Sequence, residues 1–252
     1  MKHPVTAATG HDVPGAHGSW LLHEDGHTAR VRRWPGDAGT VHLVTVDHAV
    51  PSPTVVERWV DRLAADGFHT VRTGALGPTA QPPFLEAGFV VRQELALLQH
   101  ELEGVRTTVI PSERLLMRRG RSTDLAALAA IDLRAFGQLW SMDVDGIVDA
   151  CRATPYHRLR VASNGAAPIA YAVSGRAGRA AYLQRLAVDP AAQGEGVGRE
   201  LTLDSLRWAR RHRCTSVLVN THVENERALT LYRSVGFAEL AYRLAVLEWE
   251  RQ

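Results

Sequence analysis

A glycine-rich turn between an apolar strand and an amphipathic segment constrains the fold of this 252-residue chain more than any other feature. The turn, Gln193-Gly194-Glu195-Gly196-Val197-Gly198, follows the apolar stretch Leu183–Val188 and opens a segment with apolar residues near helical spacing. Glycines in such a turn let backbone N–H groups approach an anion, which the positive end of the following helix also favours. The pattern therefore predicts a strand, a turn that binds phosphate or pyrophosphate, and a helix. A tight turn without a ligand is the alternative interpretation.

A second motif follows in the last quarter of the chain: Asn225-Glu226-Arg227-Ala228-Leu229-Thr230-Leu231-Tyr232-Arg233-Ser234-Val235-Gly236-Phe237. Its first residue suits a helix N-cap, and Gly236 suits the left-handed residue that ends a helix. Together the two segments resemble the acetyl-CoA-binding half of the GNAT superfamily of N-acetyltransferases. That family has Q/R-x-x-G-x-G/A after a strand and N-x-x-A-x-x-L-Y-x-x-x-G-F on a later helix. The resemblance covers residues 121–249, roughly half of the chain.

The resemblance implies acetyl-CoA as co-substrate and no metal. In the family, the strand backbone pairs with the pantetheine arm, the turn binds the pyrophosphate, and the equivalent of Tyr232 can protonate the leaving thiolate. Tyr232 is therefore the catalytic candidate, although it could instead pack on its helix with the hydroxyl at a rim. The implied cofactor-binding residues are Leu186, Ala187, Val188, Gln193, Gly194, Glu195, Gly196, Val197, Gly198, Arg199, Asn225, Ala228 and Tyr232.

Four residues are expected at the acceptor: Trp140, Asp143, Gln184 and Asn220. The first two lie on a connector that commonly lines the acceptor pocket in the family, although Trp140 would equally suit helix packing. The other two stand where relatives carry a glutamate that acts as a base, so the usual carboxylate is missing at both places.

The general base therefore stays open among Glu224, Asp143, Asp145 and His222, each of which also suits a solvated surface. A weak base serves an α-amine, with a pKa of about 8, better than a lysine amine, with a pKa of about 10.4.

The order of patterns predicts two units. We expect residues 1–110 to form a degenerate GNAT-like unit, of which 1–18 are disordered, and residues 111–252 to form the GNAT acetyltransferase domain. Gly88-Phe89 and Gly236-Phe237 both precede long apolar strands, which suggests a weak internal duplication. The first copy lacks a glycine turn at residues 49–53 and has Phe84 in the place of Tyr232, so we expect it to serve as a scaffold. Two unrelated α/β pieces are the alternative.

The predicted fold class is α/β, with a GNAT-type mixed central β-sheet flanked by helices and preceded by a smaller α/β unit. Residues 137–153 are expected to form a loop or a second helix. The remaining helices are expected at 54–65, 123–136, after the glycine turn, and at 225–235. The strands are expected near 27–34, 40–46, 69–73, 90–102, 158–162, 169–174, 180–188, 216–220 and 242–248.

Composition limits the partners. With 45% hydrophobic and 22% charged residues the chain is typical of soluble globular proteins, and a net charge of +2 provides no long-range attraction for nucleic acid. Two cysteines are too few for a disulfide framework or a zinc site. No signal peptide or membrane span is evident. We expect a cytoplasmic monomer or homodimer without nucleic-acid, membrane or metal partners.

The function expected from the resemblance is transfer of an acetyl group from acetyl-CoA to a primary amine of a small molecule or peptide, by direct attack on the thioester. A tandem arrangement also resembles that of mycothiol synthases, which acetylate a small amine. Two alternatives stay open: a protein N-terminal acetyltransferase, and a non-catalytic acetyl-CoA sensor. The missing base favours the sensor, whereas the intact Tyr232 argues against it.

Overall fold

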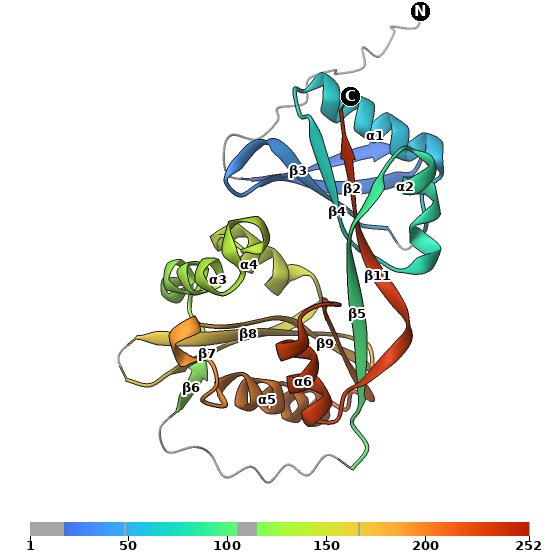
Figure 1. The fold of residues 1–252 in the computed structure, drawn as a ribbon. Helices are drawn as coiled ribbons and strands as arrows, with labels where there is room; N and C mark the ends of the chain where they lie inside the picture. The colour runs from blue at the N-terminus through green and yellow to red at the C-terminus, as the bar shows by residue number, and fades with distance from the viewer. Residues whose placement is uncertain (1–17, 48, 105–114, 166, 252) are drawn as a thin grey trace, which may run out of the picture.

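A computed structural model describes residues 18–47, 49–104, 115–165 and 167–251 of the chain. The described strands form one eleven-stranded sheet in the order β1-β2-β3-β4-β11-β5-β10-β9-β8-β7-β6 (Figure 1). Residues 1–17 of the segment 1–18 that is expected to be disordered, and the unit boundary expected between residues 110 and 111, lie outside the described residues. The mixed α/β architecture, with helices flanking a large sheet, confirms the predicted fold class.

The strands are β1 (Ser19–Glu24), β2 (His27–Trp34), β3 (Asp37–Thr45), β4 (Thr70–Leu76), β5 (Val90–Glu101), β6 (Leu116–Arg119), β7 (Tyr156–Ser163), β8 (Pro168–Ala177), β9 (Ala180–Val188), β10 (Ser216–His222) and β11 (Ala238–Glu250). The helices are α1 (Pro53–Ala65), α2 (Pro82–Glu86), α3 (Leu125–Trp140), α4 (Val144–Arg152), α5 (Val197–Arg211) and α6 (Glu226–Ser234). The sequence patterns miss β1 and β6, the two edge strands, because short edge strands carry little alternation.

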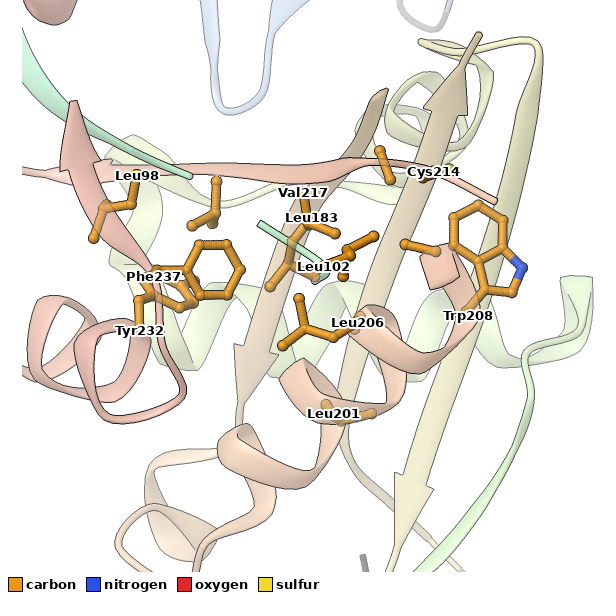
Figure 2. Close-up of a cluster of buried hydrophobic side chains, with 14 of the residues drawn as sticks. Leu98, Leu102, Leu183, Leu201, Leu206, Trp208, Cys214, Val217, Tyr232 and Phe237 are labelled. Atoms are coloured by element: carbon orange, nitrogen blue, oxygen red, sulfur yellow. The ribbon is translucent and has the colours of Figure 1, made fainter. Parts of the chain in front are cut away.

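The elements gather into two lobes. The first contains β1 to β4 with α1 and α2, and the second contains β6 to β10 with α3 to α6 (Figure 1). In the second lobe α3 and α4 cover one face of the sheet, where Leu128, Ile131 and Tyr171 are buried. On the opposite face α5 and α6 cover a larger core that includes Leu201 and Leu206 (Figures 1 and 2).

The first lobe has one helical layer. Helix α1 buries Val55, Val56, Trp59, Val60 and Leu63, the face predicted from its periodicity. These side chains pack against the apolar residues of β2 and β3. Along both strands, polar and aromatic residues alternate with these apolar ones. The alternate residues Arg32, Trp34 and His42 line a cavity shared with the second lobe.

Strands β5 and β11 join the two lobes (Figure 1). Strand β5 pairs with β10, from Glu101 opposite Ser216 to Leu95 opposite His222, and so completes the second lobe. The last part of strand β11, Ala245–Glu250, pairs with β4, and so β11 completes the first lobe. As a consequence Leu98, from the first half of the chain, is buried in the second core near Tyr232 and Phe237 (Figure 2).

The two halves end in the same local structure. In each, a parallel strand–helix–strand unit is followed by a short helix, a glycine with positive φ and a long strand. The glycines are Gly88 (φ 87°) and Gly236 (φ 98°). The backbone N–H of Phe89 donates to the carbonyl of Phe84 at 3.0 Å, and that of Phe237 donates to the carbonyl of Tyr232 at 3.0 Å. The duplication stays a prediction, but this correspondence is what it requires.

Candidate active site

The glycine turn opens toward a cavity at the start of α5. Gly194 (φ 88°) and Gly196 (φ 81°) adopt left-handed backbone conformations that other residues rarely tolerate. Gly196 precedes α5 and has no side chain to cap it, so the first N–H groups of the helix are available to an anion. At Gly198 a Cβ would be in van der Waals contact, 3.4 Å from Leu231 Cδ2 and 3.6 Å from Val188 Cγ2, so a larger side chain would project toward these residues.

Strands β9 and β10 separate just before the turn. They pair in parallel only over Ala180–Tyr182, whereas β9 pairs with β8 as far as Val188. The backbone of β9 beyond Tyr182 therefore has a free edge on the β10 side. A cavity of about 520 Å³ is lined by Leu186 and Val188, the glycine turn and α6. An extended amide-bearing ligand could pair with this edge as an added strand does.

Helix α6 forms the opposite wall. The Asn225 side chain caps the helix, with its Oδ1 accepting from the Ala228 N–H at 3.1 Å. Tyr232 packs against Phe237 with ring centroids 5.6 Å apart, and among the described residues its hydroxyl has no hydrogen-bond partner. Burial raises the pKa of the Tyr232 phenol well above its usual value, so the hydroxyl is protonated at physiological pH.

A second cavity, of about 510 Å³, lies between the two lobes and meets the first. Both are lined by Phe136, Leu186, Asn225, Ala228 and Tyr232. The second lobe further contributes Trp140, Met142, Gln184, Asn220 and His222, among others, and the first lobe contributes Arg32, Trp34, His42 and Thr73, among others. The arrangement lets two ligands approach Tyr232 from different sides.

Aromatic rings dominate the side of this cavity that the first lobe provides. Trp34 packs edge-on against Trp140, with centroids 6.2 Å apart, and against His42 at 5.9 Å. The Arg72 guanidinium lies over the Trp34 ring, 4.7 Å from its centroid. Burial, with the nearby Arg32 and Arg30 cations, lowers the pKa of His42 to about 4, so its imidazole is neutral at pH 7.

The buried carboxylate of Asp132 stabilises the wall of the second cavity on the side of α3. Asp132 is fully buried and pairs with Arg185 of β9, whose Nε donates at 2.8 Å. It also accepts from the Tyr171 hydroxyl at 2.5 Å and from the Met142 N–H at 2.6 Å. Arg185 donates in turn to the Trp140 carbonyl at 2.8 Å. The network therefore orients two residues that line the second cavity.

Most of the predicted cofactor residues line the first cavity. Glu195 is exposed and does not line it, and the Ala187 side chain is buried on the other face of β9, under α3 and α4. Those that line it are Leu186, Val188, Gln193, Gly194, Gly196, Val197, Gly198, Arg199, Asn225, Ala228 and Tyr232.

Three of the four predicted acceptor residues, Trp140, Gln184 and Asn220, line the second cavity. Asp143 does not: its carboxylate caps α4 by accepting from the Gly146 N–H at 2.8 Å and pairs with Arg32 at 2.8 Å. It serves the junction between the lobes.

Among the candidate bases only His222 lines a cavity, since Glu224 is 86% exposed and neither Asp143 nor Asp145 lines either one. The Nδ1 of His222 accepts from the Glu224 N–H at 3.1 Å. With Nδ1 occupied as an acceptor, Nε2 is the ring nitrogen left to face other partners.

Some lining residues are absent from the sequence predictions. Arg227 and Leu231 lie on α6 at helical spacing from Asn225, Ala228 and Tyr232, so periodicity could have found them. Arg32, Trp34 and His42 had no such signal, because only the tertiary structure brings the first lobe to the cavity.

This geometry defines a class of protein. It is a mixed α/β domain with an open glycine turn, a separated strand pair and two cavities that meet at one tyrosine. The sequence adds a likeness to a known family. Residues 125–237, somewhat less than half of the chain, match the family model described as Acetyltransferase (GNAT) family.

Curated relatives match parts of the chain. N-alpha-acetyltransferase RimI of Mycobacterium tuberculosis is 36% identical over 95 residues, which cover 36% of this chain and 58% of that protein. Mycothiol acetyltransferase of Acidothermus cellulolyticus is 46% identical over 52 residues, covering 21% of this chain and 16% of that protein. The chain thus spans less than two thirds of either relative.

Solved structures resemble the chain over most of its length. A tandem GNAT protein from the clavulanic acid biosynthesis pathway superposes with a TM-score of 0.65 at 13% identity, covering 92% of this chain and 82% of that one. A GCN5-related N-acetyltransferase from Kribbella flavida gives a TM-score of 0.61 at 13% identity, covering 93% and 90%. At these identities the likeness shows the fold alone.

Two further observations concern ions and membranes. Within the described ranges, no three His, Cys, Asp or Glu side chains are grouped so that they could hold a metal ion. No helix in the same part of the chain is long and apolar enough to cross a bilayer.

Proposed function

We propose that this chain is an acetyl-CoA-dependent N-acetyltransferase that acetylates a primary amine of a small molecule. The observation that carries the proposal is the meeting of two cavities at Tyr232, one beside the glycine turn and one between the lobes. The family model that residues 125–237 match and the names of the relatives support acetyl transfer.

In the proposed complex the pyrophosphate of acetyl-CoA binds at the N-terminus of α5, and the pantetheine arm follows the free edge of β9. The amine enters from the cavity between the lobes and attacks the thioester carbonyl. The C–N bond forms, the C–S bond breaks, and the thiolate leaves. Holding both reactants in place is the larger part of such catalysis.

Tyr232 has a defined part in this reaction. A thiol, with a pKa of about 8.5, is a stronger acid than a phenol, with a pKa of about 10, and burial raises the pKa of Tyr232 further. We therefore assign to Tyr232 a hydrogen bond that stabilises the leaving thiolate. The ammonium group formed by the attack supplies the proton that the thiolate finally takes.

The lining of the second cavity favours an amine that arrives neutral. Among its described lining residues there is no Asp or Glu, and His42 is neutral. An amine of pKa about 8 has a substantial neutral fraction at pH 7 without help from a base, whereas a lysine amine does not. The volume of about 510 Å³ suits a small molecule.

A peptide α-amine is the second candidate acceptor, and the relative N-alpha-acetyltransferase RimI favours it. Calorimetry with acetyl-CoA, followed by thiol-release assays over small amines and peptides, tests both. Tight binding and turnover of small amines support the proposal. Turnover of peptides alone favours the second candidate, binding without turnover favours a sensor, and no binding overturns the proposal.

The part played by the first lobe has its own test. Trp34→Ala and Trp140→Ala should each raise the acceptor KM about tenfold while the KM for acetyl-CoA changes less than about twofold, since an aromatic contact contributes on the order of 1 kcal/mol or more. Tyr242→Ala, at an exposed aromatic that lines neither cavity, is the control.

The proposal also includes the location and the oligomeric state: we expect a cytoplasmic monomer or homodimer.

A further inference from the structure

A third cavity, of about 570 Å³, lies at the edge of the second lobe. Its walls come from β6 and β7, the start of α3, the end of α4 and Trp208 of α5. None of its lining residues lines either cavity of the candidate active site. The cavity is therefore a separate feature of the molecule, and a ligand bound in it would not depend on the proposed function.

We propose that this cavity binds a compact molecule bearing two or more phosphate groups. Five guanidinium groups and one imidazole line it, contributed by Arg119, Arg121, Arg152, Arg158, Arg160 and His157. No Asp or Glu is among its described lining residues. Arg119, Arg121 and Arg152 are exposed, so water screens part of their mutual repulsion, and an anion held among them would relieve the rest.

The acidic partners nearby do not balance this charge. Asp204 of α5 is the carboxylate that pairs with both Arg158 and Arg160, the latter at 3.0 Å. In the described part of the chain, no carboxylate forms a salt bridge with Arg119, Arg121 or Arg152; Asp124 pairs with Arg118 and also accepts from the Arg121 backbone N–H at 2.7 Å. Three cations are thus left for a ligand, beyond the two that share one carboxylate.

Further arginine side chains lie close to the arginines that line the cavity. Burial, together with the Arg160, Arg211 and Arg207 cations, lowers the pKa of Arg158 to about 10, which still leaves it charged at pH 7. The Nε and Nη2 atoms of Arg207 are buried without a hydrogen-bond partner among the described residues, and Arg207 Nη2 lies 3.9 Å from the Glu200 carboxylate. The local field therefore extends beyond the lining residues and attracts anions.

The geometry favours phosphate over a single carboxylate. A guanidinium group presents paired N–H donors that match two oxygens of a phosphate group. Here such groups line one cavity from β6, the segment after β6, α4 and β7, so a ligand with several phosphates can engage them together. Leu125, Val148 and Trp208 add an apolar part to the wall, on which a nucleotide base could pack.

Titration calorimetry of the full chain with tripolyphosphate, and separately with ATP, tests the proposal. Coenzyme A is present at saturation so that the glycine turn is occupied. We expect one site with micromolar affinity for tripolyphosphate. Tighter binding of ATP than of tripolyphosphate would assign the apolar wall to a nucleotide base, and equal binding would assign the site to the phosphates alone.

The variants avoid residues whose loss would leave Asp204 unpaired. Arg121→Ala and Arg152→Ala, at exposed arginines, should each weaken binding about tenfold, whereas Arg179→Ala, at an exposed arginine outside the cavity, should leave it unchanged. The proposal is overturned by absence of binding at millimolar tripolyphosphate or by equal loss in Arg179→Ala. Displacement by coenzyme A would also overturn it, because the anion would then belong to the glycine turn.

Discussion

One hydroxyl separates Tyr232 from Phe84, its counterpart in the first half of the chain. Both rings are buried. In each half the backbone carbonyl accepts an equivalent hydrogen bond: that of Phe84 from the Phe89 N–H, and that of Tyr232 from the Phe237 N–H. The ring therefore has a structural role in each half, and only the second half has a hydroxyl beside two cavities.

Tyr232→Phe should consequently fold normally and bind acetyl-CoA within about twofold, but lose about 100-fold in kcat, the smaller end of the effect of removing one donor to a developing anion. Steady-state kinetics with calorimetry measures both, and Tyr242→Phe, at an exposed tyrosine, is the control. Full activity of Tyr232→Phe would remove the assigned role.

Gly198→Val tests the space in the first cavity. The added side chain would project toward Leu231 and Val188, so we expect at least a tenfold weaker affinity for acetyl-CoA with little change in Tm. Gly77→Val is a matched control, since Gly77 has an ordinary extended backbone and open space around its Cβ position. An unchanged affinity in Gly198→Val would contradict the assignment of this cavity to acetyl-CoA.

The pH dependence of acetylation tests the absence of a strong base. Because only the neutral amine attacks, kcat/KM for the acceptor should rise about tenfold per pH unit up to the pKa of the amine and then level off. His42 takes up a proton only near pH 4, so it should add no step near pH 6.5. Two acceptors of different pKa check this, and a step at one pH for both would contradict it.

At the scale of elements, Asp132 ties α3 to the sheet and to the residues that follow α3. Asp132→Asn leaves the Arg185 cation buried without its partner, so we expect a loss of about 3–5 kcal/mol in the free energy of unfolding and a higher acceptor KM. Urea unfolding measures the first effect. The control is Arg134→Ala, which removes an exposed ion pair with Asp189 and should cost less than about 1 kcal/mol. Equal losses of unfolding free energy in Asp132→Asn and Arg134→Ala would refute the role of the network.

At the scale of the whole molecule, each lobe is completed by a strand from the other half of the sequence. Residues 115–252 produced alone would lack β5, which leaves the β10 edge unpaired and removes Leu98 from the core. We expect this fragment to aggregate, and to fold when residues 1–104 are produced with it. Size-exclusion chromatography and circular dichroism check the result. A stable, monomeric fragment would show that β5 is dispensable.

Much of the second lobe could be predicted from the sequence because its signals are local. The positive φ of Gly194 and Gly196, the Asn225 cap and the apolar face of α5 each depend on a few neighbouring residues. Short edge strands such as β6 escaped prediction because four residues cannot establish a period.

The sequence by itself determined the glycine turn, the order of most elements and the helix that carries Tyr232, because backbone conformation and periodicity act over a few residues. Only the tertiary structure decided that Trp34 packs against Trp140 and His42, that Asp143 pairs with Arg32, and that β5 and β11 exchange between the lobes. Those contacts join residues far apart in the chain, where pairing energy and packing, rather than local preference, select the partner.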